Sequence, residues 1–381
     1  MSLPPILPLS TIGPLVTRIL GHNPGPFTLQ GTNSYLVGYP HLPRVLIDTT
    51  SRGPGLSAYL HHLSIALGSC SRNMCPISGI ILTHWHPDHV QAVPDVLNLA
   101  RQFVNRSDET VIPVYKYPGG PNLKALEFYK GPLIDLHDDS VIALPNGQSN
   151  ELPPAQLHVH STPGHSDDHI CLLLRANNRP VHLFVGDLIL GHGSTTVHDL
   201  EAYMNSLGKT RCLVSRCEQE ATRQEGQFTL CPGHGLEVDQ CVEKVDEYIA
   251  NRKSRIDKTR EFFTTNQPGL WFSEDQILPY VYPDVNEALR MAARINLRHS
   301  LFWLAAHRSE SAELGLDLMA RRQCDNQVVS AEEFRDLLVR LEEKFRMGDK
   351  VNPDHWLNEK LLTSWQWTRK SQPVDFAYTV P

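Results

Sequence analysis

Hydrophobic residues in the first two thirds of the chain follow two different spacings, and together these predict alternating strands and helices. Short apolar runs predict strands near residues 33–38, 44–48, 78–82, 157–161, 170–174 and 181–187. A spacing of three and four residues, typical of one helix face, is carried by Leu56, Leu60, Leu63 and Leu67. Such an alternation of strands and helices is typical of the α/β class.

The pattern is less regular from residue 104 to 155, where prolines and glycines separate short hydrophobic runs. We expect a strand, a loop, a helix and a strand there, in that order. Apolar positions from Val242 to Ile256 then predict a long helix, which carries several basic residues near its end. A solvated helix face is the favoured interpretation of these charges, and a surface for an acidic carrier protein or RNA is the alternative.

A new unit is expected after the Asn-Gln-Pro-Gly sequence at 266–269. Ser273 followed by Gln276 is a capping box that predicts a short helix, and residues 289–297 and 331–345 have helical spacing. The tail contains three residues that fit no pattern: Trp356, Trp365 and Trp367. This organisation predicts a first domain at 1–262 and a helical second domain with a tail at 263–381.

Composition narrows the function. The net charge of −7 argues against a nucleic-acid partner, because such binding depends on neutralising phosphates with lysine and arginine. No basic segment leads into an apolar one near the start, and no apolar stretch is long enough to span a bilayer, so we expect a cytoplasmic protein without membrane association. The eight cysteines include no Cys-x-x-Cys pair and are expected to be free thiols.

Metal-binding residue types are concentrated directly after the strand expected at 78–82, in the sequence Thr-His-Trp-His-Pro-Asp-His at 83–89. His84 and His86 lie two positions apart, so both rings point to one side of an extended backbone. Asp88 and His89 follow a turn at Pro87, which allows them to face a second ion. Imidazole and carboxylate ligands together suit zinc, with iron or manganese as alternatives.

Three further residues of ligand type follow apolar runs later in the chain: His165, Asp187 and His234. Each has a glycine as the preceding residue, which allows the backbone to turn closely. These strand ends and the first motif can therefore converge on one edge of the fold.

The pattern His-x-His-x-Asp-His resembles the signature of the metallo-β-lactamase superfamily. The resemblance implies an αββα sandwich of two mixed sheets with helices outside, followed by a small, helical, winged-helix-like domain at the C-terminus. It also implies that an aspartate after the opening hairpin supports the metal loop, and Asp48 matches that position. Capping of the next helix is an equally good interpretation of Asp48.

The resemblance assigns seven ligands to two zinc ions. His84, His86 and His165 would bind the first ion, and Asp88, His89 and His234 the second. Asp187 would bridge both. Two adjacent cations make hydroxide available near neutral pH and stabilise a developing oxyanion, and Asp88 would be the catalytic residue that orients the nucleophile and passes on its proton. This is hydrolytic chemistry without a redox cofactor.

Longer stretches, including Asn-Pro-Gly-Pro-Phe-Thr-Leu-Gln-Gly-Thr-Asn at 23–33, resemble the acyl-carrier-protein thioesterases of fungal aromatic polyketide pathways, such as the atrochrysone carboxyl thioesterases. This similarity covers about residues 15–260. It implies release of a polyketide chain from a synthase that lacks its own thioesterase. The implied partner is the acyl carrier protein domain of a non-reducing polyketide synthase.

Other functions remain open. The mitochondrial β-lactamase-like endoribonucleases share almost all of these stretches, but His192, the acidic net charge and the lack of an evident transit peptide favour the thioesterase. A glyoxalase II-like thioesterase is a third alternative, without a recognisable basic tail. A degenerate scaffold is disfavoured because all seven ligands are present. Gln91 and Ala92 stand where the family usually has glycines, which leaves the shape of the substrate site open.

Overall fold

The computed structural model describes residues 3–71, 74–104, 111–119, 129, 131–147, 152–223, 227–267, 270–285, 287–306, 316–322 and 363–369. They belong to two compact units, Met1–Ile249 and Ala250–Pro381. Helix α5 (Cys241–Thr265) begins in the first unit and ends in the second. The helix expected at 331–345 and Trp356 lie outside the described residues. The domain boundary at 262/263 stays a prediction.

The first sheet of the first unit begins antiparallel and ends parallel. Its strands are adjacent in chain order: β1 (Leu9–Gly13), β2 (Val16–Leu20), β3 (Asn33–Val37), β4 (Arg44–Ile47), β5 (Ile77–Leu82), β6 (Val114–Lys116) and β7 (Leu133–Asp135). The first four pair antiparallel, whereas β4 to β7 pair parallel. The parallel connection from β4 to β5 passes through α1 (Leu56–Leu67), as a crossover requires.

The second sheet is mostly antiparallel. Its order is β12 (Thr229–Pro232), β11 (Arg179–Gly186), β10 (Ile170–Ala176), β9 (Ala155–Ser161) and β8 (Val141–Ala143). Only the β11–β12 pair is parallel, and α4 (Leu200–Arg223) lies between these two strands in the sequence. In the described part of residues 104–155 the structure has β6, β7 and β8 and no helix, so the helix expected there is not found in that part.

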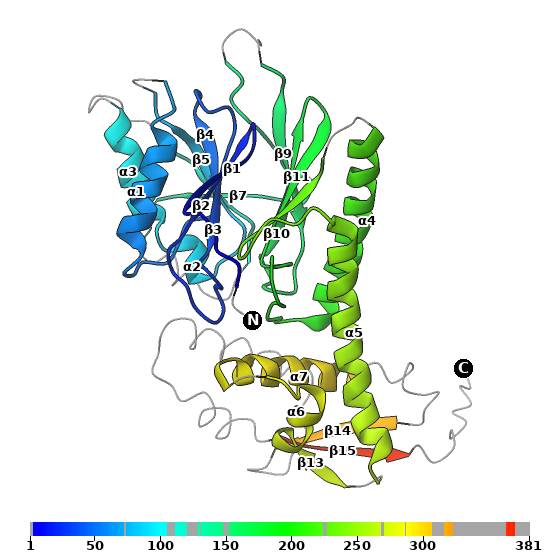
Figure 1. Cartoon of the computed structure of the whole chain (residues 1–381). Helices are drawn as coiled ribbons and strands as arrows, with labels where there is room; N and C mark the ends of the chain where they lie inside the picture. The colour runs from blue at the N-terminus through cyan, green and yellow to red at the C-terminus, as the bar shows by residue number, and fades with distance from the viewer. Residues whose placement is uncertain are drawn as a thin grey trace, which may run out of the picture. The chain divides into compact units, whose positions relative to one another are not determined.

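The two sheets lie face to face with helices on the outer sides, α1 and α3 (Val93–Ala100) on one side and α4 on the other (Figure 1). Side chains alternate between two cores because successive residues of a strand point to opposite faces. Leu36 and Leu46 pack beneath α1 and α3. Tyr35 and Ile47 instead pack between the sheets, against residues of β9, β10 and β11. This four-layer arrangement confirms the αββα sandwich expected from the sequence.

Two of the predicted helices in the second unit are present. Helix α6 (Glu274–Val281) starts at Ser273, whose backbone N–H donates to Gln276 Oε1 over 2.8 Å, and this confirms the capping box. Next come η3 (Glu287–Leu289) and α7 (Arg290–Ala306). The unit also has an antiparallel sheet in the order β13 (Trp271–Ser273), β15 (Thr363–Arg369) and β14 (Leu316–Arg322). Helices combined with such a small sheet are consistent with a winged-helix-like domain.

The basic end of α5 is used mainly within the second unit. Arg255 donates to the carbonyl oxygen of Val281 over 2.7 Å and lies 4.5 Å from the ring centroid of Tyr282. Arg260 pairs with Asp257 over 2.6 Å. These contacts argue against a surface that binds an acidic partner, and the half-buried Arg255 and Arg260 also differ from the fully solvated face favoured from the sequence.

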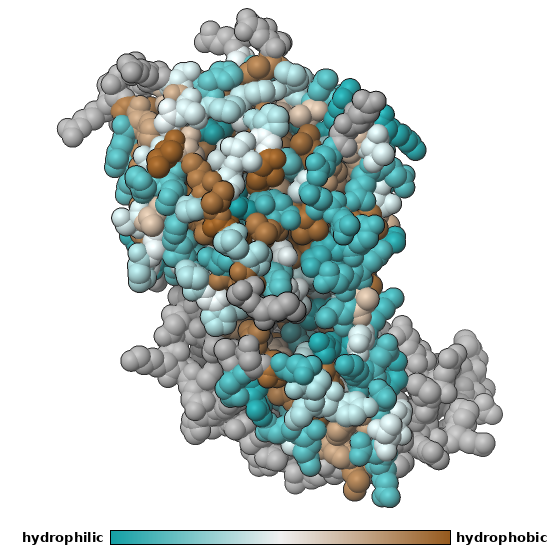
Figure 2. All heavy atoms as spheres, in the orientation of Figure 1, coloured by the Kyte–Doolittle hydropathy of each residue, from teal (hydrophilic) through white to brown (hydrophobic). Residues whose placement is uncertain are grey.

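Exposed large hydrophobic side chains are scattered along the part of the chain that the structure describes. The most exposed large hydrophobic residues, Val111, Leu7 and Ile65, lie in different parts of the chain. Figure 2 shows hydrophobic side chains as separate patches among polar ones on the face in view. No described helix is long and apolar enough to cross a membrane.

Acid should destabilise the first unit partly through His182. This residue of β11 is 5% exposed, and burial, opposed by Asp239, lowers its pKa to about 4. Unfolded histidine titrates near pH 6.5, so the unfolded chain binds the proton first. The contribution to stability is therefore complete above pH 6.5 and falls by up to about 3 kcal/mol as the pH drops to 4.

Urea unfolding of the native chain and of His182→Gln between pH 4 and 8 measures this effect. The variant should show the shallower loss of unfolding free energy below pH 6.5, whatever its stability at pH 8. Equal slopes in the two proteins would contradict the assignment to His182.

Candidate metal centre

The seven ligands predicted from the sequence all follow the ends of strands in the first unit. His84 follows the end of β5, and Asp88 and His89 lie in the short helix α2 (Pro87–Val90). His165, Asp187 and His234 lie four, one and two residues past the ends of β9, β11 and β12. Because the last of these strands pairs parallel with β11, their carboxyl ends meet at one edge. The structure brings all seven predicted residues together there.

The first set comprises His84, His86, His165 and Asp187, all buried. His86 Nδ1 lies 2.8 Å from His84 Nε2 and 2.9 Å from His165 Nε2. The Oδ2 atom of Asp187 lies 3.4 Å from His165 Nε2 and 3.8 Å from His84 Nε2. Three imidazole nitrogens and one carboxylate oxygen thus face a common point.

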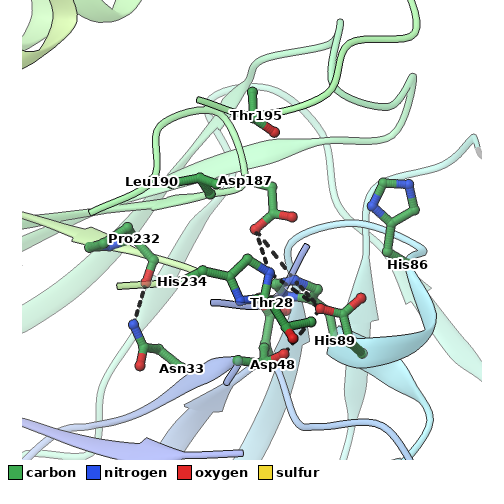
Figure 3. A network of polar contacts seen from close by, with 12 residues as sticks. Thr28, Asn33, Asp48, His86, His89, Asp187, Leu190, Thr195, Pro232 and His234 are labelled. Carbon is green, nitrogen blue, oxygen red and sulfur yellow. Dashed lines mark hydrogen bonds and ion pairs between the residues drawn. The ribbon is translucent and has the colours of Figure 1, made fainter. Parts of the chain in front are cut away.

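The second set comprises Asp88, His89 and His234. Asp88 Oδ2 lies 3.3 Å from His89 Nε2 and 3.3 Å from His234 Nε2. Asp187 Oδ1 lies 3.4 Å and 3.3 Å from the same two nitrogens. The Asp187 carboxylate therefore lies between the sets and presents a different oxygen to each, and Figure 3 shows it directed at His89 and His234.

Glycine makes this close arrangement possible at Gly233. A Cβ atom added there would lie 2.5 Å from Asp187 Oδ1 and 2.9 Å from the ring of His89. No other residue type leaves that space for the Asp187 carboxylate. The glycine in the Pro-Gly-His sequence at the end of β12 is thus explained by the close approach of Gly233 to the Asp187 carboxylate.

Asp48 supports the motif loop from behind. Its Oδ1 accepts the Thr83 backbone N–H over 2.7 Å, and its Oδ2 accepts the Thr83 hydroxyl over 2.7 Å and lies 2.8 Å from His89 Nδ1. A carboxylate at Nδ1 orients the ring and directs Nε2 to the metal. Helix α1 begins after Gly55, so the alternative role of Asp48 as its cap is wrong.

His84, His165 and His234 are oriented in a similar way. His84 Nδ1 lies 3.0 Å from Thr83 Oγ1, and His165 Nδ1 lies 2.8 Å from the Thr196 carbonyl oxygen and 3.0 Å from Thr195 Oγ1. His234 Nδ1 lies 3.3 Å from the carbonyl oxygen of Gly31. Such partners hold the other ring nitrogen toward the shared centre.

The carboxylates and imidazoles of the second set shift one another's pKa values. Burial alone would raise the pKa of Asp88 and Asp187, but His89 and His234 hold both well below the usual range. In the opposite sense, the two carboxylates overcome burial and raise the pKa of His234 to about 9 and that of His89 well above its ordinary value. The two carboxylates thus favour positive charge at the second set, which a bound cation would supply.

Two buried polar atoms at the centre also indicate that the residues suit a divalent cation. This observation does not depend on the order of the ligands in the sequence. His89 Nε2 and Asp187 Oδ1 are buried and lie 3.4 Å apart as an ion pair, but neither atom makes a hydrogen bond of good geometry with a described residue. Buried polar atoms are rarely left in this state, because each costs free energy unless a proton donor, water or ion satisfies it. A cation between them would satisfy both. Imidazole and carboxylate are ligands typical of zinc and related transition metals.

Sequence reasoning gave no role to three residues at the centre: Thr32, His169 and His198. Thr32 Oγ1 donates to Asp88 Oδ2 over 3.0 Å. His169 Nε2 accepts the backbone N–H of Asp187 over 3.1 Å. Burial lowers the pKa of His169 to about 4 and so keeps it a neutral acceptor. The ring of His198 lies 6.2 Å from that of His165. In the sequence, His169 lies in a segment rich in histidine and aspartate, which indicates a site. Thr32 has no such neighbours and looks like an ordinary turn residue.

The unusual residues after the motif have structural contacts. Val90 belongs to the core beneath α1 and α3. Gln91 Oε1 accepts the backbone N–H of Arg52 over 3.1 Å, and Ala92 is fully buried. These contacts account for the three side chains without a substrate.

Comparison with known proteins agrees with this geometry. The family model described as metallo-beta-lactamase superfamily matches residues 27–213. The chain is 35% identical over 297 residues to the Beta-lactamase-like protein 2 homolog of Caenorhabditis elegans, covering 78% of this chain and 86% of that protein. A beta-lactamase domain protein from Burkholderia ambifaria has a similar fold, with a TM-score of 0.57, 16% identity, and coverage of 84% of this chain and 93% of the other.

Fungal relatives are also similar. The chain is 35% identical over 258 residues to the Lactamase-like protein nscB of Aspergillus fumigatus, covering 67% of this chain and 63% of that protein. It is 32% identical over 254 residues to the Atrochrysone carboxyl ACP thioesterase of the same species, covering 67% and 66%. The chain thus spans slightly less than two thirds of the length of these fungal relatives. These matches confirm the resemblance drawn from the motif: the chain belongs to the metallo-β-lactamase superfamily and is a metal-dependent hydrolase.

Proposed function

We propose that the chain is a dinuclear zinc hydrolase that cleaves an acyl-carrier-protein-bound polyketide thioester. The observation that carries the two-metal part is the Asp187 carboxylate, whose oxygens face different ligand sets. His84, His86 and His165 would hold the first ion with Asp187, and Asp88, His89 and His234 the second. The expected cytoplasmic location is part of the same proposal.

When bound, the ions would supply Lewis-acid activation of water and of the thioester carbonyl. Asp88 would orient the attacking water and accept its proton, and it is partly open, with a side-chain exposure of 17%. The proton then passes to the leaving sulfur, so that a C–O bond forms, the C–S bond breaks, and an acid and a thiol leave. Asp48 and Thr83 keep His89 and His84 in place throughout.

The substrate class is supported by the fungal relative whose name specifies an acyl-carrier-protein thioesterase. Its partner would be the carrier domain of a non-reducing polyketide synthase without a thioesterase of its own. His192, exposed in the loop after Asp187, is one of the features of the sequence that favoured this subfamily, together with the acidic net charge.

A second candidate is hydrolysis of RNA. Stretches of this sequence, including residues 23–33, also resemble those of the mitochondrial β-lactamase-like endoribonucleases. The same metal-assisted attack would then act on a phosphodiester.

Parallel assays on a carrier-bound acyl thioester and on single-stranded RNA distinguish these candidates. The zinc-loaded chain should release acyl groups and leave RNA intact, and Asp88→Asn should lower the release rate by about 10²–10⁴-fold. RNA cleavage that Asp88→Asn abolishes, with the thioester untouched, would establish the second candidate and refute the thioesterase.

A further inference from the structure

The turn before β3 reaches the metal centre through Thr32. This side chain is fully buried, and its hydroxyl lies 3.0 Å from Asp88 Oδ2. On its other side, Thr32 Oγ1 lies 3.0 Å from Asn23 Nδ2. These two contacts form a hydrogen-bonded series from Asn23 through Thr32 to the Asp88 carboxylate.

Asn23 fixes which group donates and which accepts in this series of hydrogen bonds. Its Oδ1 accepts the Thr32 backbone N–H over 2.8 Å, so the NH₂ group must face the Thr32 hydroxyl oxygen. The same NH₂ group donates to Ser51 Oγ over 3.2 Å. Since Thr32 Oγ1 accepts from Asn23, its single proton is available for Asp88 Oδ2. That oxygen is also the one that faces His89 and His234.

The same turn holds a second member of the second ligand set. Gly31 supplies the carbonyl oxygen near His234 Nδ1. The Asn33 backbone N–H donates to the Gly233 carbonyl oxygen over 2.7 Å, and Asn33 Nδ2 donates to Pro232 and Gly235. His165 of the first set is held by Thr195 and Thr196. The turn therefore acts on the second set.

We infer that Thr32 is a positioning residue for the second ion, and that Asn23 acts through it by directing the hydroxyl proton to Asp88 Oδ2. This series of hydrogen bonds from Asn23 through Thr32 to Asp88 is called the relay below. It would hold Asp88 with Oδ2 toward the ion and leave Oδ1 for the reacting water. This inference rests on the proposed ligand assignment. Its consequence is specific: the affinity for one of the two ions depends on the direction of a hydrogen bond outside the ligand sets.

Zinc titration of the metal-free chain against a chromophoric chelator measures both affinities without using activity. Thr32→Val keeps the shape and removes the donor, so we expect one affinity to fall by about 10–100-fold and the other to stay unchanged. Thr32→Ser restores the hydroxyl and should restore the affinity. Thr50→Val is the matched control, because this buried hydroxyl donates to the Gly21 carbonyl oxygen at 3.0 Å and should keep both ions.

Asn23→Asp tests the direction of the relay. A carboxylate cannot donate, so the Thr32 hydroxyl would turn toward the new carboxylate and away from Asp88. The added negative charge by itself would strengthen cation binding, whereas the relay requires weaker binding of the second ion. Combining Asn23→Asp with Thr32→Val should then weaken binding no further than either change alone.

The outcomes separate the two proposals. Two zinc ions in the native chain with an unchanged Thr32→Val titration would overturn the relay and leave the proposed function intact. Tighter binding by Asn23→Asp would also overturn it. A native chain that binds fewer than two ions would refute the ligand assignment, and the relay with it.

Discussion

An Asp187→Asn variant is expected to lose zinc from both ligand sets and to hydrolyse thioester at least about 10³-fold more slowly, because several kcal/mol of Lewis-acid stabilisation are lost. The amide keeps the shape of the side chain but removes the negative charge, and one of its two ends is a donor. Either Oδ1, which faces His89 and His234, or Oδ2, which faces His84 and His165, is replaced by NH₂. An NH₂ group cannot bind a cation, and the other set keeps only a neutral oxygen.

Elemental analysis after dialysis, together with kcat/KM, measures this result. Asp246→Asn is the control, since this carboxylate is exposed and pairs with Arg211 away from the centre. It should keep both ions and full activity. Two zinc ions per chain in Asp187→Asn would refute the bridging role of the carboxylate.

Gly164→Ala is expected to destabilise the first unit by about 3 kcal/mol or more, as overpacking against backbone adds to a strained conformation. A Cβ atom at Gly164 would lie 2.3 Å from the backbone nitrogen and Cα of Tyr203 in α4, and the residue has φ +131°. Its carbonyl oxygen also accepts the N–H groups of His198 and Asp199. Relief of the clash must therefore move either α4 or the loop that carries His165.

Thermal unfolding of the zinc-loaded chain and its zinc content measure the effect of Gly164→Ala. We expect a lower unfolding midpoint and weaker binding in the first set. Gly208→Ala is the matched control, because this glycine of α4 has open space at the Cβ position. The control should be neutral or stabilised by up to about 1 kcal/mol through helix propensity. An unchanged midpoint in Gly164→Ala would contradict the packing argument.

Local patterns predicted α1, α6 and most of the strands from β3 onward, but they did not predict β1, β2 or the long helix α4. The leucines at 56–67 form α1 as expected, and the capping box at Ser273 starts α6. Hydrophobic spacing did not correctly predict the elements in the region of β6 to β8, where each strand has three residues. A run of three residues is too short to show alternation, and pairing with neighbouring strands decides its conformation.

The ligand types were visible because the metal chemistry needs imidazole and carboxylate side chains, and few other roles place them beside glycine at strand ends. The residues that orient them were not visible. Asn23 and Thr32 look like ordinary turn residues, and their connection to Asp88 joins segments 56 positions apart. Arg255 of α5 is a further example, because its partner, the carbonyl oxygen of Val281, lies 26 positions away and no local pattern reveals it.

The sequence by itself determined the α/β class, the capacity for metal binding and the order of the ligands, because these follow from side-chain chemistry and short-range spacing. The tertiary structure decided which oxygen of Asp187 faces which set, that Asp48 holds His89, and that a turn before β3 orients Asp88. These are contacts between distant segments at distances of about 3 Å. Such contacts are fixed when two sheets pack and their strand ends meet, and no local pattern specifies them.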